Sequence, residues 1–286
     1  MELDVGCTFV FAVPTATHAI MLVEPHSSEL HRVVGSRLDI IPHTPSIPYV
    51  DSFANRRRRT TFKAGTVEVS FVARVDASPV ADVVDEDARL HEPQDLPDDA
   101  LRFLLPSRYC ESDQLVDLAW AQFASIPPGW ARVQAINDWV HARLQFDYGS
   151  SSPSHSAASV LEGGVGVCRD FTHLAIGLCR ALNIPARYVS GYLPDIDVVP
   201  TPPDFCAWME VFLGDRWYTF DPRNNQRRIG RVVIGRGRDA ADVAMFTSFG
   251  QMDLIEMNVL AEPVDHQGNT MFIEASRSTR QVCDTL

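Results

Sequence analysis

Alternating apolar and polar residues in the first part of the chain predict β-strands. The clearest case is residues 66–75, where nearly every second side chain is apolar, as in a strand that buries one face. Shorter apolar runs at residues 7–13 and 18–23 fit further strands. These patterns predict an N-terminal antiparallel β-sandwich over residues 1–77.

A change of pattern near residue 100 predicts a second domain. Residues 78–100 are rich in Asp, Glu and Pro without a sustained period, which indicates an exposed linker. Beyond Pro106, apolar residues recur at helical spacing in two segments separated by Pro-Pro-Gly at residues 127–129. Their apolar faces consist of Leu115, Leu118, Ala119 and Phe123, and of Val133, Ile136, Val140 and Leu144. We therefore predict an α+β chain whose core domain spans residues 101–286.

The overall composition argues against nucleic acid or membrane as a partner. The 286-residue chain carries a net charge of −12, which would repel a phosphate backbone. No apolar run approaches the ~18 residues of a membrane helix, and the acidic start of the chain is unlike a secretory signal. We expect a cytoplasmic protein. The one basic run, Arg56 to Arg59, is interpreted as a solvated loop.

Cys168 follows a glycine-rich segment and is predicted to lie in the first turn of a helix. Residues 163–171 read Gly-Gly-Val-Gly-Val-Cys-Arg-Asp-Phe, and apolar residues at helical spacing follow until Asn-Ile-Pro at residues 183–185. The free N–H groups and the positive dipole end of a first turn stabilise a thiolate, which favours a nucleophile. The alternative is a small buried hydrophobic residue, the role that we assign to Cys179 on the same helix.

Residues 206–213 and 216–221 are predicted to form a hairpin around the turn Gly214-Asp215. In this register Leu213 lies opposite Arg216. Cys206 and Asp221 are then diagonal neighbours on one face, about 7–8 Å apart. A base at position 206 and an orienting carboxylate at Asp221 would fit this geometry.

Several segments, taken in order, closely resemble bacterial transglutaminase-like proteins. They are Gly-Val-Cys-Arg-Asp-Phe-Thr-His-Leu-Ala at 166–175, Asn-Ile-Pro-Ala-Arg-Tyr-Val-Ser-Gly-Tyr at 183–192, Asp-Phe-Cys-Ala-Trp at 204–208, Trp-Tyr-Thr-Phe-Asp at 217–221 and the tail 235–243. Residues 1–77 resemble the N-terminal β region of the same group. The resemblance implies a papain-like core with helices packed on an antiparallel sheet, and a Cys-His-Asp triad without a cofactor. Such a triad forms a thioester from a peptide or protein amide and passes the acyl group to water or an amine.

Carried over by position, Cys168 is the nucleophile, Asp221 is the orienting carboxylate, and Cys206 stands where the family has histidine. A histidine would lower the thiol pKa from about 8.5 towards 3–4 and then protonate the leaving amine, and a thiol does neither. General acid–base catalysis contributes about 10²–10⁴-fold, so a severely slowed amidase is expected unless another base substitutes. Of the nearby histidines, His173 is predicted to be structural, and His155 lies in the polar loop before the helix.

Two functions therefore stay open from the sequence. One is a cysteine hydrolase or acyl transferase with an atypical triad, and the other is an impaired relative that binds a peptide or protein partner. A zinc site formed by Cys168, Cys206 and Asp221 would have suitable ligands without their usual close spacing, and we expect no metal.

Overall fold

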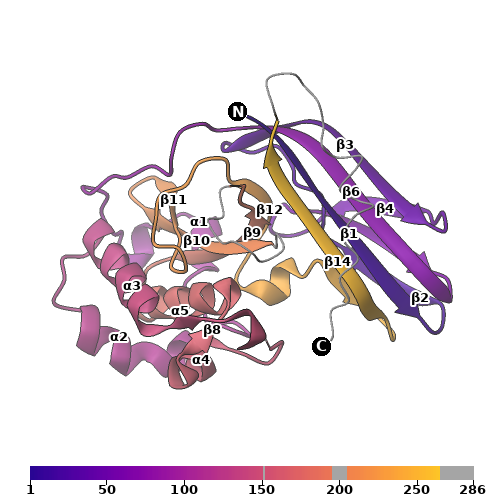
Figure 1. Ribbon diagram of the computed structural model, residues 1–286. Helices are drawn as coiled ribbons and strands as arrows, with labels where there is room; N and C mark the ends of the chain where they lie inside the picture. Colours follow the sequence, from indigo (N-terminus) through magenta and orange to yellow (C-terminus); the bar gives the residue numbers. More distant parts are fainter. Residues whose placement is uncertain (151, 195–204, 265–286) are drawn as a thin grey trace.

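The computed structural model describes residues 1–150, 152–194 and 205–264, arranged as two parts side by side (Figure 1). A β-sandwich of two four-stranded sheets forms one part, and an antiparallel sheet with helices packed on it forms the other. One continuous cluster of buried hydrophobic residues runs through both parts. The predicted α+β class with antiparallel sheets is confirmed. Within the described ranges, the helices are too short or too polar to cross a membrane.

The strand predictions for the sandwich are confirmed. In β6 (Gly65–Ala77), the apolar side chains of the alternating pattern are buried and their neighbours are half-buried. The first sheet has the order β14-β1-β6-β3, with β14 (Asp253–Pro263), β1 (Glu2–Val13) and β3 (His31–Ile41). The second has the order β13-β2-β5-β4, with β13 (Phe246–Ser248), β2 (Thr17–Met21), β5 (Arg56–Phe62) and β4 (Ser46–Val50).

The far end of the described chain completes both sheets of the sandwich. Strand β14 pairs antiparallel with β1 along almost its whole length, and β13 pairs with β2. The sequence interpretation had placed these residues in the core domain. A strand that pairs with residues more than two hundred positions away leaves no local signal of its partner, which is why the pattern does not reveal it.

The interpretation of Arg56 to Arg59 as a solvated loop is wrong, because these residues begin strand β5. Arg57 is buried, and its Nε donates to Asp51 Oδ2 at 2.7 Å. Arg58 forms an ion pair with Glu24. Carboxylates from neighbouring segments thus neutralise Arg57 and Arg58. The sequence shows the run of arginines but not these partners.

Residues 78–100 lie along the core instead of standing free of it. Ala88 is buried, and its carbonyl oxygen accepts from Trp130 N–H at 3.0 Å. The Asp85 carboxylate accepts from the Tyr218 hydroxyl at 2.9 Å. The segment contains the short turns η1 (Pro93–Asp95) and the start of α1 (Asp98–Leu101). It therefore attaches to the core sheet through specific contacts.

The core sheet has the strand order β11-β10-β9-β12, with β9 (Ala186–Tyr192), β10 (Cys206–Leu213), β11 (Arg216–Phe220) and β12 (Val232–Gly237). Helix α5 (Cys168–Ala181) packs against β9 and β10 and is buried from Asp170 onward. The other helices around it are α2 (Val116–Phe123), α3 (Trp130–Arg143) and α4 (Ala157–Gly163). A two-residue parallel pair, β7 (Gln145–Phe146) and β8 (Val165–Gly166), leads into α5 (Figure 1).

Gly191 allows β9, β10 and β12 to pack closely beside Cys206, its partner on β10. A Cβ atom at this position would overlap the Val232 carbonyl oxygen and lie 2.6 Å from the Trp208 ring. Overpacking of this kind costs about 1–3 kcal/mol, so Gly191→Ala is expected to lower the free energy of unfolding, measured by urea denaturation, by that amount. Gly163→Ala is the control, because nothing lies within 4 Å of its added Cβ. Equal stability of the two variants would contradict this packing account.

Candidate active site

Cys168 begins α5, and its neighbours fix the first turn. The Asp170 carboxylate reaches back so that Oδ2 accepts from Val167 N–H at 3.0 Å, which satisfies one of the free donors at the helix start. An added Cβ on Gly166 would lie 2.7 Å from Asp170 Cβ. Glycine at this position therefore allows the close approach of the capping carboxylate.

The Cys168 thiol lies against the start of β10. Its Sγ is 3.9 Å from the carbonyl oxygen of Phe205, the residue that precedes Cys206. The Phe205 ring stacks on Phe9 of the sandwich at 6.0 Å and packs near Tyr192 at 5.4 Å. These contacts place the thiol where α5, β10 and the sandwich come together. Cys168 is half-buried there.

Cys206 lies at the first position of β10, and the hairpin has the predicted register, with Leu213 opposite Arg216. Its side chain packs in a small cluster whose buried members are Val189, Trp208 and Val233. Alternate residues of the same strand, Ala207 and Met209 among them, belong to the large core that includes α5. Cys168 thus contacts the backbone at the start of β10, whereas the Cys206 side chain joins the Trp208 cluster.

Asp221 is buried at the end of β11, and its carboxylate accepts several hydrogen bonds. Oδ1 accepts from Asn224 N–H at 2.9 Å, and Oδ2 accepts from Asn224 Nδ2 at 3.0 Å and from Arg231 at 3.1 Å. Arg231 also donates to Asp82 at 3.0 Å, and its guanidinium lies 4.8 Å from the centre of the Trp208 ring. Although burial opposes it, the Asp221 and Asp82 carboxylates raise the pKa of Arg231.

Asp221 therefore shares a buried ion-pair network with Arg231, a residue that the sequence interpretation missed. The only sequence signal was an arginine ten residues downstream of the expected orienting carboxylate, and spacing of that kind is not specific. Buried carboxylates require such partners, because an uncompensated charge in the interior is costly.

The structural role predicted for His173 is confirmed. Its Nε2 accepts from Ala240 N–H at 3.1 Å, and its ring lies between Tyr109 and Tyr188, with centroids 5.2 and 5.1 Å away. Burial, together with the charges of Arg169 and Arg180, lowers the pKa of His173 well below its usual value. The neutral imidazole is held inside the core, which supports a structural role and not proton transfer.

His155 lies beside the same first turn that Cys168 begins. Its Nδ1 is 3.7 Å from Asp170 Oδ2. Arg169 donates to the Ser152 carbonyl oxygen at 2.7 Å and to Asp170 Oδ1 at 3.2 Å, so it joins the loop before α4 to the start of α5. Cys168, Asp170 and His155 are thus part of one local structure. Over the ranges that the structure describes, groups of three or more His, Cys, Asp or Glu suited to a metal are absent.

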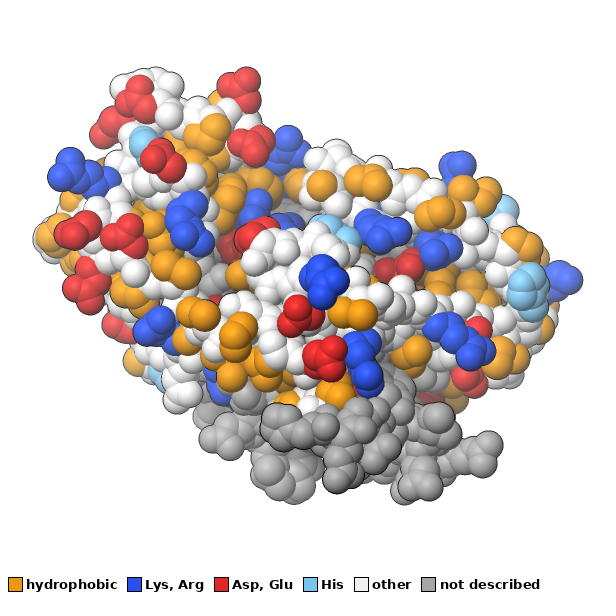
Figure 2. Space-filling model, turned by 90° about the horizontal axis from the view of Figure 1, so that it is seen from above, with side chains coloured by type: hydrophobic (Ala, Val, Ile, Leu, Met, Phe, Trp, Pro, Cys, Tyr) orange, Lys and Arg blue, Asp and Glu red, His pale blue; other side chains and the backbone are white. Residues whose placement is uncertain are grey.

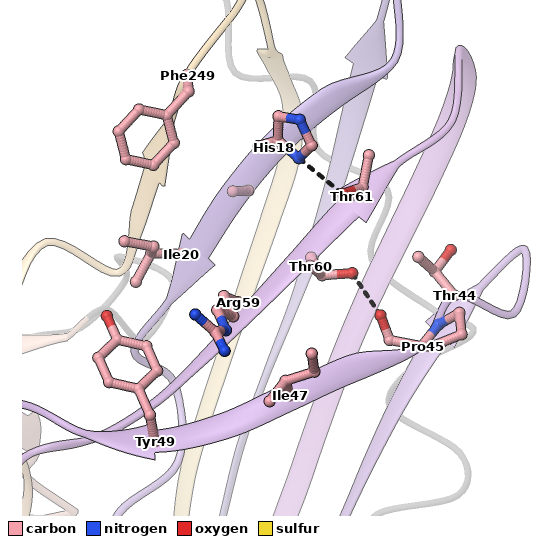
Figure 3. A pocket seen from close by; sticks show the side chains of 11 residues that line it. His18, Ile20, Thr44, Pro45, Ile47, Tyr49, Arg59, Thr60, Thr61 and Phe249 are labelled. Carbon is pink, nitrogen blue, oxygen red and sulfur yellow. Dashed lines mark hydrogen bonds between the residues drawn. The ribbon is translucent and has the colours of Figure 1, made fainter.

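The sandwich carries a separate concave surface of about 690 Å³ on its second sheet (Figure 3). Ile20, Ile47, Tyr49 and Phe249 give it an apolar lining, and a His18–Thr61 hydrogen bond of 2.7 Å lies at its rim. None of the candidate site residues contributes to this surface. Elsewhere the outer surface mixes acidic and basic side chains, as the face in Figure 2 shows.

These features define an α+β protein with a half-buried cysteine at the start of a helix that packs on an antiparallel sheet. The family model of the transglutaminase-like superfamily matches residues 119–222, a range that includes Cys168, Cys206 and Asp221. The crystal structure of a candidate cysteine protease from Cytophaga hutchinsonii is 32% identical, with a TM-score of 0.83, over 93% of this chain and 91% of that chain. The chain belongs to the transglutaminase-like superfamily.

Two mycobacterial relatives extend the comparison. An uncharacterized protein of Mycobacterium leprae is 26% identical over 273 residues, which cover 86% of this chain and 92% of that protein. An uncharacterized protein of Mycobacterium tuberculosis is 36% identical over 126 residues, 39% of this chain and 40% of its own length. The similarity to the first relative thus includes most of both chains, the sandwich as well as the core.

Proposed function

We propose that the chain is a cysteine hydrolase or acyl transferase that acts on amide bonds of peptides or proteins through a thioester at Cys168. The observation that carries this proposal is the contrast among the thiols. Burial raises the thiol pKa of Cys7, Cys110 and Cys179 to about 12, whereas Cys168 is half-buried at a helix start. A helix N-terminus favours the thiolate that nucleophilic attack requires.

In the proposed reaction the Cys168 thiol gives its proton to a base, and the sulfur attacks the amide carbonyl carbon. A C–S bond forms, the base transfers the proton to the nitrogen, and the C–N bond breaks as the amine leaves. Water then attacks the thioester and gives up a proton, the C–S bond breaks, and the thiol is regenerated with release of the acid. An amine in place of water gives a new amide.

A chromogenic amide tests this proposal directly. The intact chain is incubated with a peptide p-nitroanilide, and release of p-nitroaniline is followed before and after alkylation of Cys168 by iodoacetamide. Saturable release that stops when the Cys168 peptide is alkylated supports the proposal. Release that continues at full rate after complete alkylation of Cys168 would overturn it.

Cys206 occupies the family's base position without supplying a base, so changing its thiol should matter little. Cys206→Ser keeps a small side chain in the Trp208 cluster and is expected to change kcat/KM for the p-nitroanilide by less than about threefold. A loss of 10²-fold or more, the amount that general acid–base catalysis contributes, would show that Cys206 itself takes part in the reaction.

A second function, binding of a peptide or protein partner without turnover, is favoured by one observation. The Asp221 carboxylate is already engaged by Asn224 and Arg231, so it is not poised to orient a separate base. For a binding protein, peptide affinity would be measurable by calorimetry and would survive Cys168→Ala, while the wild-type chain would release no p-nitroaniline.

A further inference from the structure

We propose that His155 is the catalytic base for Cys168 and that Asp170 orients it, a local replacement for the histidine missing at position 206. This inference rests on the proposed function and identifies the group that transfers the proton. His155 lies next to the start of the helix that carries the nucleophile. His155 Nδ1 lies 3.7 Å from Asp170 Oδ2, and the same oxygen accepts from the N–H of Val167, the residue before Cys168. The imidazole therefore lies beside the turn that carries the nucleophile.

The carboxylate of Asp170, the proposed orienting group, is held rigidly. Asp170 is fully buried, and its two oxygens are held by Val167 N–H and by the Arg169 guanidinium at 3.2 Å. Arg169 also donates to the Ser152 carbonyl oxygen, so the loop that carries His155 is fixed to the helix start. A carboxylate fixed in this way can hold one nitrogen of an imidazole while the other nitrogen reacts.

The His155 ring has a nitrogen available for pairing. Nδ1 is shielded from solvent and makes no hydrogen bond within the described residues, because 3.7 Å to Asp170 exceeds hydrogen-bond length. A small rotation of the His155 side chain would convert this contact into a charge-assisted hydrogen bond when the ring takes up a proton. The side chain is still 31% exposed, so part of the ring is open to solvent and to a bound substrate.

In this arrangement the neutral ring accepts the Cys168 proton through Nε2, and the resulting imidazolium is paired with Asp170. The ring then returns that proton to the leaving amine as the C–N bond breaks. His173 is not available for this step, since its Nε2 already accepts from Ala240 N–H inside the core. The candidate base thus comes from the loop that precedes α4.

The test compares alkylation of Cys168 across pH in the wild-type chain and in His155→Gln. The second-order rate with iodoacetamide is measured from pH 5 to 9 by peptide mapping. A histidine-paired thiol reacts well below pH 7, and an ordinary one titrates near about 8.5. We expect the variant's profile to move towards that higher value, with the rate at pH 6.5 reduced about tenfold or more.

One further variant serves as a control, and another tests the orienting carboxylate. His141→Gln removes an exposed histidine of α3 that bonds the Arg223 carbonyl oxygen, and it should leave the profile unchanged. Asp170→Asn keeps an acceptor for Val167 N–H but removes the charge, so it should shift the profile in the same direction as His155→Gln. Thermal unfolding of each variant verifies that it is folded.

The possible outcomes separate the two proposals. If wild-type Cys168 reacts well below pH 7 and His155→Gln reacts identically, His155 is not the base, while the proposed nucleophile stands. If wild-type Cys168 itself titrates as an ordinary thiol, both the base assignment and the proposed function are overturned.

Discussion

Replacement of Cys168 by alanine is expected to abolish turnover of amide and ester substrates, a loss on the order of 10³-fold or more, because no thioester can form without the sulfur. The assay is kcat/KM for a peptide p-nitroanilide and for a p-nitrophenyl ester. Stability should change little, since Cys168 is half-buried at the first position of α5.

Cys179→Ala is the matched control, because Cys179 lies on the same helix. Cys179 is fully buried, and burial raises its thiol pKa to about 12, so its thiol takes no part in chemistry. This variant should lose some stability to the small cavity that it creates and should keep its kcat/KM. Equal kcat/KM in the two variants would contradict the assignment of Cys168 as nucleophile.

Arg231→Met is expected to destabilise the fold by about 3–5 kcal/mol. The substitution leaves the Asp221 and Asp82 carboxylates buried without their shared cation, and breaking a buried pair from one side has that cost. The Arg231 side chain is 2% exposed, and its Asp221 and Asp82 partners are 2% and 9% exposed. Urea denaturation measures the loss.

Arg238→Met provides the comparison, because its ion pair with Asp242 involves an arginine side chain that is 44% exposed. Exposed pairs contribute about 0–1 kcal/mol, so this variant should unfold close to the wild-type midpoint. A second variant, Asp221→Asn in the Arg231→Met background, should recover part of the lost stability. An Arg231→Met variant as stable as Arg238→Met would refute the network as a buried ion-pair cluster.

The features that the sequence predicted are those whose signals are local. The alternation of residues 66–75, the apolar face of α5 and the turn Gly214-Asp215 each lie within a few residues of the structure that they specify. The same holds for Cys168, whose glycine-rich approach and position at the helix start are a single continuous segment.

The features that the sequence did not reveal depend on which residues tertiary packing brings together. Strand β14 completes the sandwich against β1. Arg57 forms an ion pair with Asp51 across a turn and donates a hydrogen bond to the Asp242 carbonyl oxygen. At the site, Arg231 engages the carboxylate that the motif assigns to base orientation. Residue spacing cannot show which of many carboxylates an arginine reaches, because that is determined by tertiary packing.

The most direct test of the central claim is to trap the acyl group on Cys168. The wild-type chain is mixed with a p-nitrophenyl ester, quenched in acid during turnover, digested, and mapped by mass spectrometry. We predict that the peptide containing Cys168 carries the added acyl mass and loses it on treatment with hydroxylamine, as a thioester does. Turnover with no acyl mass on that peptide, or with the acyl group on another residue, would contradict the account.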